Sequence, residues 1–94
     1  MKRLMIVYDV TDNRRRRLLS DLLEGYGKRV NRSVFECLFS SEAKYLKLQD
    51  EIREIVNKKE DSVRLYELCL SCIEKSKGLC DEPDPFEKDA IYFF

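Results

Sequence analysis

Hydrophobic and polar residues follow two different periods along this chain, and together they predict both strands and helices. Residues 2–8 form a short apolar run that stops at Asp9, which is typical of a central strand covered on both faces. A helix is predicted from residues 11–13, which offer capping side chains, to residues 25–27, whose glycines favour a left-handed C-cap. Its apolar face has i, i+3, i+4 spacing and comprises Leu18, Leu19, Leu22, Leu23 and Tyr26.

The next segment repeats the order of strand and helix. Residues 29–39 alternate between two faces and predict a strand, which a tight reversal at residues 31–33 splits into a hairpin. Ser40 or Ser41 is expected to cap a second amphipathic helix, and the charged residues 58–61 close it.

The last third of the chain is less regular. Residues 62–70 are rich in β-favouring side chains and predict a further strand, whereas residues 72–89 predict a loop or mobile arm. Four apolar residues, 91–94, are expected to add a last strand to the sheet of a partner subunit. We therefore expect a domain over residues 1–78 and a C-terminal arm and strand over residues 79–94.

The order strand, helix, strand pair, helix, strand predicts an α/β (α+β) fold of the ferredoxin-like type, βαββαβ with an antiparallel sheet. Because a core built from 94 residues leaves a thin margin of stability, we expect a homodimer formed through the free face of the sheet. No apolar run approaches the roughly 20 residues of a membrane span, so we expect no membrane contact and a cytoplasmic location. This fold hosts many functions, so function must be argued from particular residues.

Charge is balanced overall but unevenly distributed. Residues 1–35 hold nine Lys or Arg against four Asp or Glu, whereas residues 79–94 hold five acids against one Lys. Four consecutive arginines, residues 14–17, stand in the first turns of the predicted helix, where cations oppose the helix dipole and repel one another. A bound phosphate would compensate this cost. The alternative is a solvated face paired with Asp12 and other acids of the same helix.

Asp9 is a candidate metal ligand, because a carboxylate where a buried strand ends suits an oxygen-loving ion such as Mg²⁺. The alternative is an ordinary polar strand end. In a twofold dimer, two copies of Asp9 would face each other and share one ion, with phosphate and water completing its shell. The chain contains no His, which excludes His-based triads, so hydrolysis would need metal-activated water.

Cysteine spacing gives a weaker signal. Cys69 and Cys72 have the spacing of half a zinc site or of a redox pair, but Cys37 and Cys80 stand alone and supply no second close pair. We interpret the four as buried small hydrophobes, or as one disulfide if the source is a hyperthermophile. A metal or redox site is the alternative.

Three segments carry a resemblance to a known family. Residues 5–10 read MIVYDV, residues 27–37 read GKRVNRSVFEC, and residues 61–66 read DSVRLY. Over residues 1 to about 70 the chain closely resembles the CRISPR-associated protein 2 family. The combination of the Val-Tyr-Asp and Ser-Val-Phe-Glu runs at this spacing is what makes the resemblance specific.

The resemblance implies a ferredoxin-like homodimer whose last strand completes the partner's sheet. It also implies a Mg²⁺-dependent endonuclease that cleaves RNA or double-stranded DNA in antiviral defence, with Asp9 as catalytic residue and metal ligand. By the same resemblance Tyr8 belongs to the catalytic site. The residues implied in nucleic-acid binding are Arg15, Arg17, Arg29 and Phe35.

Two other functions stay open. The same family resemblance implies a non-catalytic dimeric scaffold, which bridges the CRISPR-associated integrase and binds the DNA to be integrated. In that role the arginines would matter and Asp9 would not. The third alternative is a ferredoxin-like regulatory or interaction domain that binds no nucleic acid.

Overall fold

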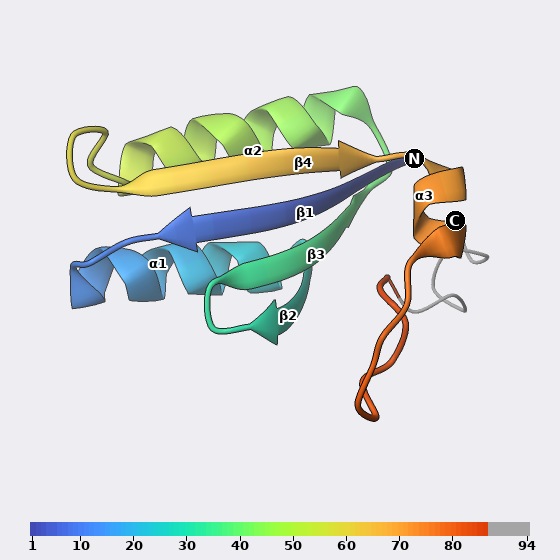
Figure 1. The fold of residues 1–94 in the computed structure, drawn as a ribbon. Helices are drawn as coiled ribbons and strands as arrows, with labels where there is room; N and C mark the ends of the chain where they lie inside the picture. Colours follow the sequence, from blue (N-terminus) through green and yellow to red (C-terminus); the bar gives the residue numbers. More distant parts are fainter. Residues whose placement is uncertain (87–94) are drawn as a thin grey trace.

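The computed structural model describes residues 1–86, and it consists of a four-stranded sheet with helices packed mainly on one side (Figure 1). The predicted hairpin is present, with its reversal between the second and third strands. In chain order the elements are β1 (Lys2–Asp9), α1 (Asn13–Glu24), β2 (Gly27–Asn31), β3 (Val34–Phe39), α2 (Glu42–Ile55), β4 (Ser62–Leu68) and α3 (Leu70–Lys75).

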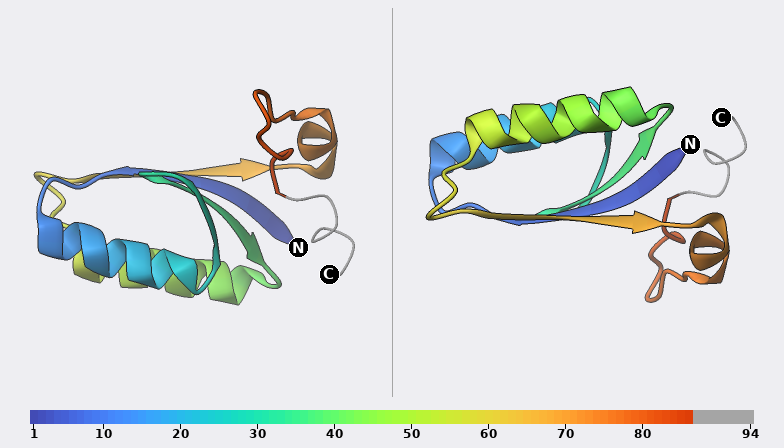
Figure 2. Two further views of the ribbon diagram at one scale, coloured as in Figure 1. Left: turned by 90° about the horizontal axis from the view of Figure 1, so that it is seen from below. Right: turned by 90° about the horizontal axis from the view of Figure 1, so that it is seen from above.

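The strands lie in the order β2-β3-β1-β4, and every neighbouring pair is antiparallel. Helices α1 and α2 cover one face of this sheet, while α3 lies on the opposite side, beyond the end of β4 (Figure 2). The ferredoxin-like arrangement predicted from the sequence is confirmed. Within residues 1–86, no helix is long and apolar enough to cross a membrane.

The core lies between the sheet and the two long helices. Alternate residues of β1 and β3 face the helices and are buried, because successive side chains of a strand point to opposite faces. Their neighbours from the helices are Leu19, Leu23, Leu48 and Ile52. The other face of the sheet keeps half-buried apolar side chains such as Val7 and Val34.

The helix ends agree with prediction at three of their four positions. Asp12 and Ser41 cap α1 and α2 by accepting hydrogen bonds from the Arg15 and Lys44 amides, and α2 ends just before residues 58–61. The predicted left-handed C-cap is wrong, because Gly25 is right-handed (φ −72°) and its amide bonds back to α1. Gly27, the second glycine, is needed for a different reason. A Cβ at this position would lie 2.1 Å from the Glu36 carbonyl oxygen, so β2 can approach β3 this closely only because residue 27 has no side chain.

The segment after β4 differs from the predicted loop. It begins with α3, anchored by the buried Ile73, and then residues 76–86 turn back over the sheet face that α1 and α2 leave open. There the Phe86 amide donates to Glu36 Oε1 at 2.9 Å, and the Phe86 side chain is buried. The predicted last strand at residues 91–94 lies outside the described residues.

The cysteine prediction holds only in part. Cys37 is buried in the core, as expected for a small hydrophobe, but Cys69, Cys72 and Cys80 are exposed. All three follow β4, in a surface segment whose buried positions are taken by Ile73 and Phe86 instead. The prediction of burial was therefore wrong for these three.

Candidate nucleic-acid interface

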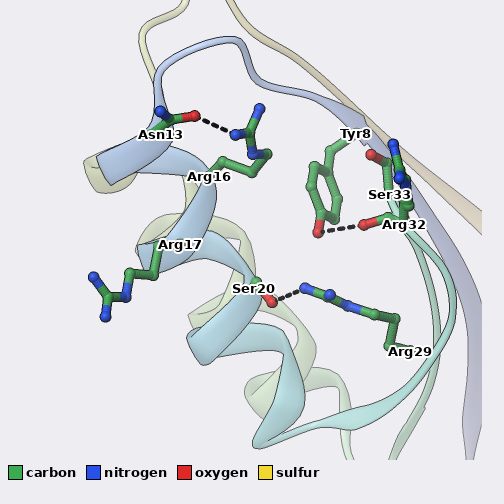
Figure 3. Close-up of a pocket in the computed structure, with 8 residues that line it drawn as sticks. All are labelled: Tyr8, Asn13, Arg16, Arg17, Ser20, Arg29, Arg32 and Ser33. Carbon is green, nitrogen blue, oxygen red and sulfur yellow. Dashed lines mark hydrogen bonds between the residues drawn. The ribbon is translucent and has the colours of Figure 1, made fainter.

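A basic pocket of about 620 Å³ opens between α1 and the turn that joins β2 to β3 (Figure 3). It is formed by one face of α1, the end of β1, and the β2–β3 hairpin. The eight residues that line it are Tyr8, Asn13, Arg16, Arg17, Ser20, Arg29, Arg32 and Ser33.

Helical periodicity explains the α1 side of the basic pocket. Four lining residues stand at i, i+3, i+4 and i+7 along α1 and therefore share one face of the helix: Asn13, Arg16, Arg17 and Ser20. The Arg16 guanidinium donates to the Val10 carbonyl oxygen at 3.4 Å and to the Asn13 side chain, so it is held near the end of β1. Arg17 is exposed, and its guanidinium points outward from α1 (Figure 3).

The opposite wall is held by contacts between β1 and the hairpin. The Tyr8 hydroxyl donates to the Arg32 carbonyl oxygen at 3.2 Å, and the Tyr8 amide donates to the Ser33 carbonyl oxygen at 3.0 Å. The Arg29 guanidinium donates to the Ser20 hydroxyl across the pocket, and it lies 5.5 Å from the centre of the Phe35 ring. These contacts fix Arg29 over an aromatic face, where a guanidinium is favourably placed.

The charge of the basic pocket is its most informative property. Four of its eight lining residues carry guanidinium groups, and among residues 1–86 no carboxylate lines it. Within residues 1–86, none of the four guanidinium groups belongs to an ion pair. Four cations gathered without counter-charge repel one another, and guanidinium forks suit phosphate oxygens geometrically. The pocket is therefore suited to a polyanion.

Three of the sequence-predicted site residues meet at this pocket: Tyr8, Arg17 and Arg29. The family resemblance did not assign Arg16 or Arg32 to nucleic-acid binding, although Arg16 belongs to the run of four arginines at residues 14–17 for which a bound phosphate is expected. The signal for Arg16 was present, because it completes the i, i+3, i+4, i+7 face with Asn13. Arg32 has no comparable signal, since its position depends on where the hairpin turns.

Arg15 lies elsewhere and is already paired. Its guanidinium donates to both carboxylate oxygens of Asp61, at 2.8 and 3.3 Å, and to Glu60 at 3.1 Å. The Asp61 side chain is 0% exposed, and it also accepts from the Asn57 amide at 2.8 Å. The Arg15 guanidinium, with this amide, lowers the pKa of Asp61. Arg15 thus ties α1 to the loop before β4, and binding of nucleic acid by Arg15 stays an untested prediction.

Phe35 is 0% exposed and forms part of the core. Its ring lies 6.3 Å from that of Tyr8, centre to centre, in a stacked arrangement, and Tyr8 is itself 3% exposed. In this conformation the Phe35 ring packs against the Arg29 guanidinium and the Tyr8 ring. Because it is fully buried, it offers no face on which a base could stack.

Asp9 is exposed at the end of β1, one residue after Tyr8. Strand alternation turns it away from the helices, toward the open face of the sheet, and it does not line the basic pocket. Within residues 1–86 no three ligand-type side chains gather to hold an ion. The single carboxylate fits Mg²⁺ only as one ligand among others, which is how this ion is often bound beside phosphates and water.

Comparison with known proteins identifies the family. Residues 1–76 match the family model described as CRISPR associated protein Cas2. The chain belongs to the Cas2 family. This confirms the resemblance carried by the MIVYDV and GKRVNRSVFEC runs, and the match includes the whole of the basic pocket and Asp9.

Two curated Cas2 relatives show how far the similarity extends. The protein named CRISPR-associated endoribonuclease Cas2 3 of Synechocystis sp. is 52% identical over 64 residues, which is 68% of each chain. CRISPR-associated endoribonuclease Cas2 1 of Chloroflexus aurantiacus is 39% identical over 89 residues, covering 94% of this chain and 95% of the relative.

Solved Cas2 structures share the fold. The crystal structure of Streptococcus pyogenes Cas2 at pH 6.5 has a TM-score of 0.74 and 29% identity, and the match covers 82% of this chain and 98% of that one. A chain of a partial Cas6-RT-Cas1–Cas2 complex has a TM-score of 0.77 and 35% identity, with 88% and 96% covered.

Proposed function

We propose that this Cas2-family protein is an endonuclease that binds the phosphates of RNA or double-stranded DNA in the basic pocket and cleaves the backbone with Mg²⁺. One observation carries the proposal: within residues 1–86, four arginines that belong to no ion pair line a pocket to which no carboxylate contributes. The names of the curated relatives, which call them endoribonucleases, support the reaction class.

The proposed metal ligand is Asp9, supplied by both subunits of a homodimer. Val7 and Val34 pair across β1 and β3 close to Asp9 and leave half-buried apolar surface on the open face. A second copy packed there about a twofold axis would cover this surface and bring the two Asp9 carboxylates together. The exposed position of Asp9 on this same face supports the arrangement.

Each group then has a defined task. Mg²⁺, when bound, supplies a Lewis acid for phosphoryl oxygens and lowers the pKa of coordinated water. Arg16, Arg17, Arg29 and Arg32 hold flanking phosphates and set the register of the strand. Tyr8 keeps the hairpin carrying Arg32 against β1 through its hydroxyl, so its contribution is to position that wall.

A second candidate function is a non-catalytic scaffold for CRISPR integration, in which the dimer bridges the integrase and grips DNA. One observation favours it: the basic pocket and Asp9 point to different faces of the sheet, so phosphate binding does not require the carboxylate. The similarity to a chain of a complex that contains Cas1 also supports it. Here the arginines would be needed and Asp9 would be dispensable.

The deciding experiment compares the wild-type protein with Asp9→Asn, which keeps the shape of the side chain and removes its charge. Labelled single-stranded RNA and double-stranded DNA are incubated with each protein in Mg²⁺ or in EDTA. We expect cleavage by the wild type in Mg²⁺ only, and a loss of about 100-fold or more in Asp9→Asn. Binding of either nucleic acid should remain, because Asp9 lies outside the basic pocket.

The matched control is Asp21→Asn, which removes an exposed carboxylate from α1 and should leave cleavage unchanged. If the wild type binds DNA but cleaves neither substrate, the scaffold function is supported instead. If neither nucleic acid binds at low salt, both functions are wrong, and the domain without a nucleic-acid partner is favoured.

A further inference from the structure

Two exposed cysteines lie beside each other where the chain leaves the sheet. Cys69 directly follows β4 and precedes α3, and Cys72 stands in the first turn of that helix. Their sulfur atoms are 3.2 Å apart, and the Ser71 hydroxyl lies 3.1 Å from Cys69 Sγ. Both thiols are open to solvent, so small reagents can reach them.

The backbone around this pair is held from both sides. Cys69 continues from β4, whose hydrogen bonds to β1 extend to Leu68, and the buried Ile73 fixes the helix that carries Cys72. The Ile73 amide also donates to the Cys69 carbonyl oxygen at 3.2 Å. A disulfide bond has a length of about 2.05 Å, so the two sulfur atoms need to approach by roughly 1 Å only.

We propose that Cys69 and Cys72 form a reversible dithiol–disulfide site, oxidised by low-molecular-weight disulfides of the glutathione class. The Cys69 thiolate attacks one sulfur of the small disulfide, which breaks the S–S bond and releases one small thiolate. Cys72 then loses its proton to solvent, and its thiolate attacks Cys69 Sγ and expels the second small thiolate. Two protein thiols are thereby oxidised by two electrons, and one small disulfide is reduced to two thiols.

The electrostatics of the pair assign the order of attack. Hydrogen bonds with the Ser71 hydroxyl and then with the Cys72 thiol lower the pKa of Cys69 to about 7, and the contact with Cys69 raises the pKa of Cys72. Cys69 is therefore the thiolate available near neutral pH, and thiolates are the attacking species in exchange.

The other cysteines differ in the properties that matter. Burial raises the pKa of Cys37 to about 12, which leaves it protonated and out of reach of reagents. Cys80 is exposed, but within residues 1–86 it does not join the pair in a group of three ligands. Two thiols that no third ligand joins within the described part of the chain suit disulfide exchange better than a closed metal site.

The proposed site is separate from the basic pocket. It lies at the end of β4 near the start of β1, whereas the pocket includes Tyr8 near the other end of β1 (Figure 1). Oxidation is expected to stiffen α3 and the chain entering residues 76–86. It should leave nucleic-acid binding in the pocket unchanged.

The test equilibrates the full-length protein with mixtures of reduced and oxidised glutathione, quenches with acid, alkylates the free thiols in denaturant and measures intact mass. The reduced protein should take up four labels, and the oxidised protein two, on a single chain. Cys72→Ser should instead retain one glutathione on Cys69. Alkylation of Cys69 in the native protein should accelerate as the pH rises through about 7.

Cys80→Ser is the matched control and should still lose two labels on oxidation. Hydrogen exchange of the Ile73 amide, measured before and after oxidation, gives a readout of α3 that needs no thiol chemistry. The proposal is overturned if four thiols remain at the most oxidising ratio. It is equally overturned if the disulfide joins Cys80 or links two chains.

Discussion

Arg15 and Arg16 are neighbours in the sequence, yet they belong to two regions of the molecule with opposite electrostatics. Arg15 is bound to the buried carboxylate of Asp61, in a region where cation and anion are matched. Arg16 faces the basic pocket, which four arginines and no carboxylate line in the part of the chain that the structure describes. The first region uses a cation to join a helix to a loop, and the second keeps cations available for a ligand.

Helix geometry produces this division. Successive residues of an α-helix are rotated by about 100°, so four consecutive arginines cannot all face one ligand. Arg16 and Arg17 share a face with Asn13, while Arg15 points toward the loop before β4. A run of like charges in a sequence therefore identifies a cationic helix end but not a single binding surface.

The largest effect should come from removing charge from the basic pocket. We expect the double change Arg16→Gln and Arg17→Gln to weaken RNA and DNA binding by roughly 100-fold, because charge-assisted contacts to phosphate are lost. The slope of log K against log salt is negative, and it should become shallower by about 1.4 for single strands and by about 1.8 for duplex DNA. Fluorescence anisotropy over a salt series measures both quantities, and thermal stability should be unchanged.

The control for this double change is Arg53→Gln on α2, an exposed arginine that pairs with Asp50 and does not line the basic pocket. It removes one cation from the same protein and should change binding little. If Arg53→Gln weakens binding as strongly as the pocket variants, then net charge rather than the pocket governs affinity.

The opposite outcome is expected for Arg15→Gln. This change leaves the buried Asp61 carboxylate without its cation, so the melting temperature should fall by roughly 5–10 °C. Nucleic-acid binding by the folded protein should be nearly unchanged. Differential scanning calorimetry and the same anisotropy assay separate the two effects. A large loss of binding with normal stability would return Arg15 to the nucleic-acid interface, as the sequence resemblance implied.

Much of the fold could be predicted because local patterns and tertiary packing agree. The alternation in β1 and β3 and the apolar stripe of α1 each point to the same covered sheet face, and capping residues mark two helix starts. The prediction failed where a feature depends on long-range contact. The short α3 is anchored through Ile73, and Gly27 is required by the closeness of β3 rather than by its own turn.

The candidate site was predicted less completely for the same reason. Tyr8, Arg17 and Arg29 were found, but the pairing of Arg15 depends on Asp61, which is 46 residues away. Phe35 was assigned to nucleic-acid binding through the family resemblance, although strand alternation alone turns it into the core. A residue's neighbours across the fold decide whether its charge or ring is available, and one sequence does not report them.

The smallest effect concerns the pH dependence of the Arg15 region. Because Arg15 lowers the folded-state pKa of Asp61 below its unfolded value, the ion pair contributes its full stability above about pH 4. This contribution is lost as the pH falls through the lower, folded-state pKa, where Asp61 takes up a proton.

The difference in melting temperature between wild type and Arg15→Gln should therefore be constant from pH 7 to about 5 and shrink below about 4. Arg53→Gln provides the comparison, since its exposed ion pair should change the melting temperature little at any pH. A difference for Arg15→Gln that persists undiminished in acid would mean that Arg15 stabilises the fold by packing rather than by its charge.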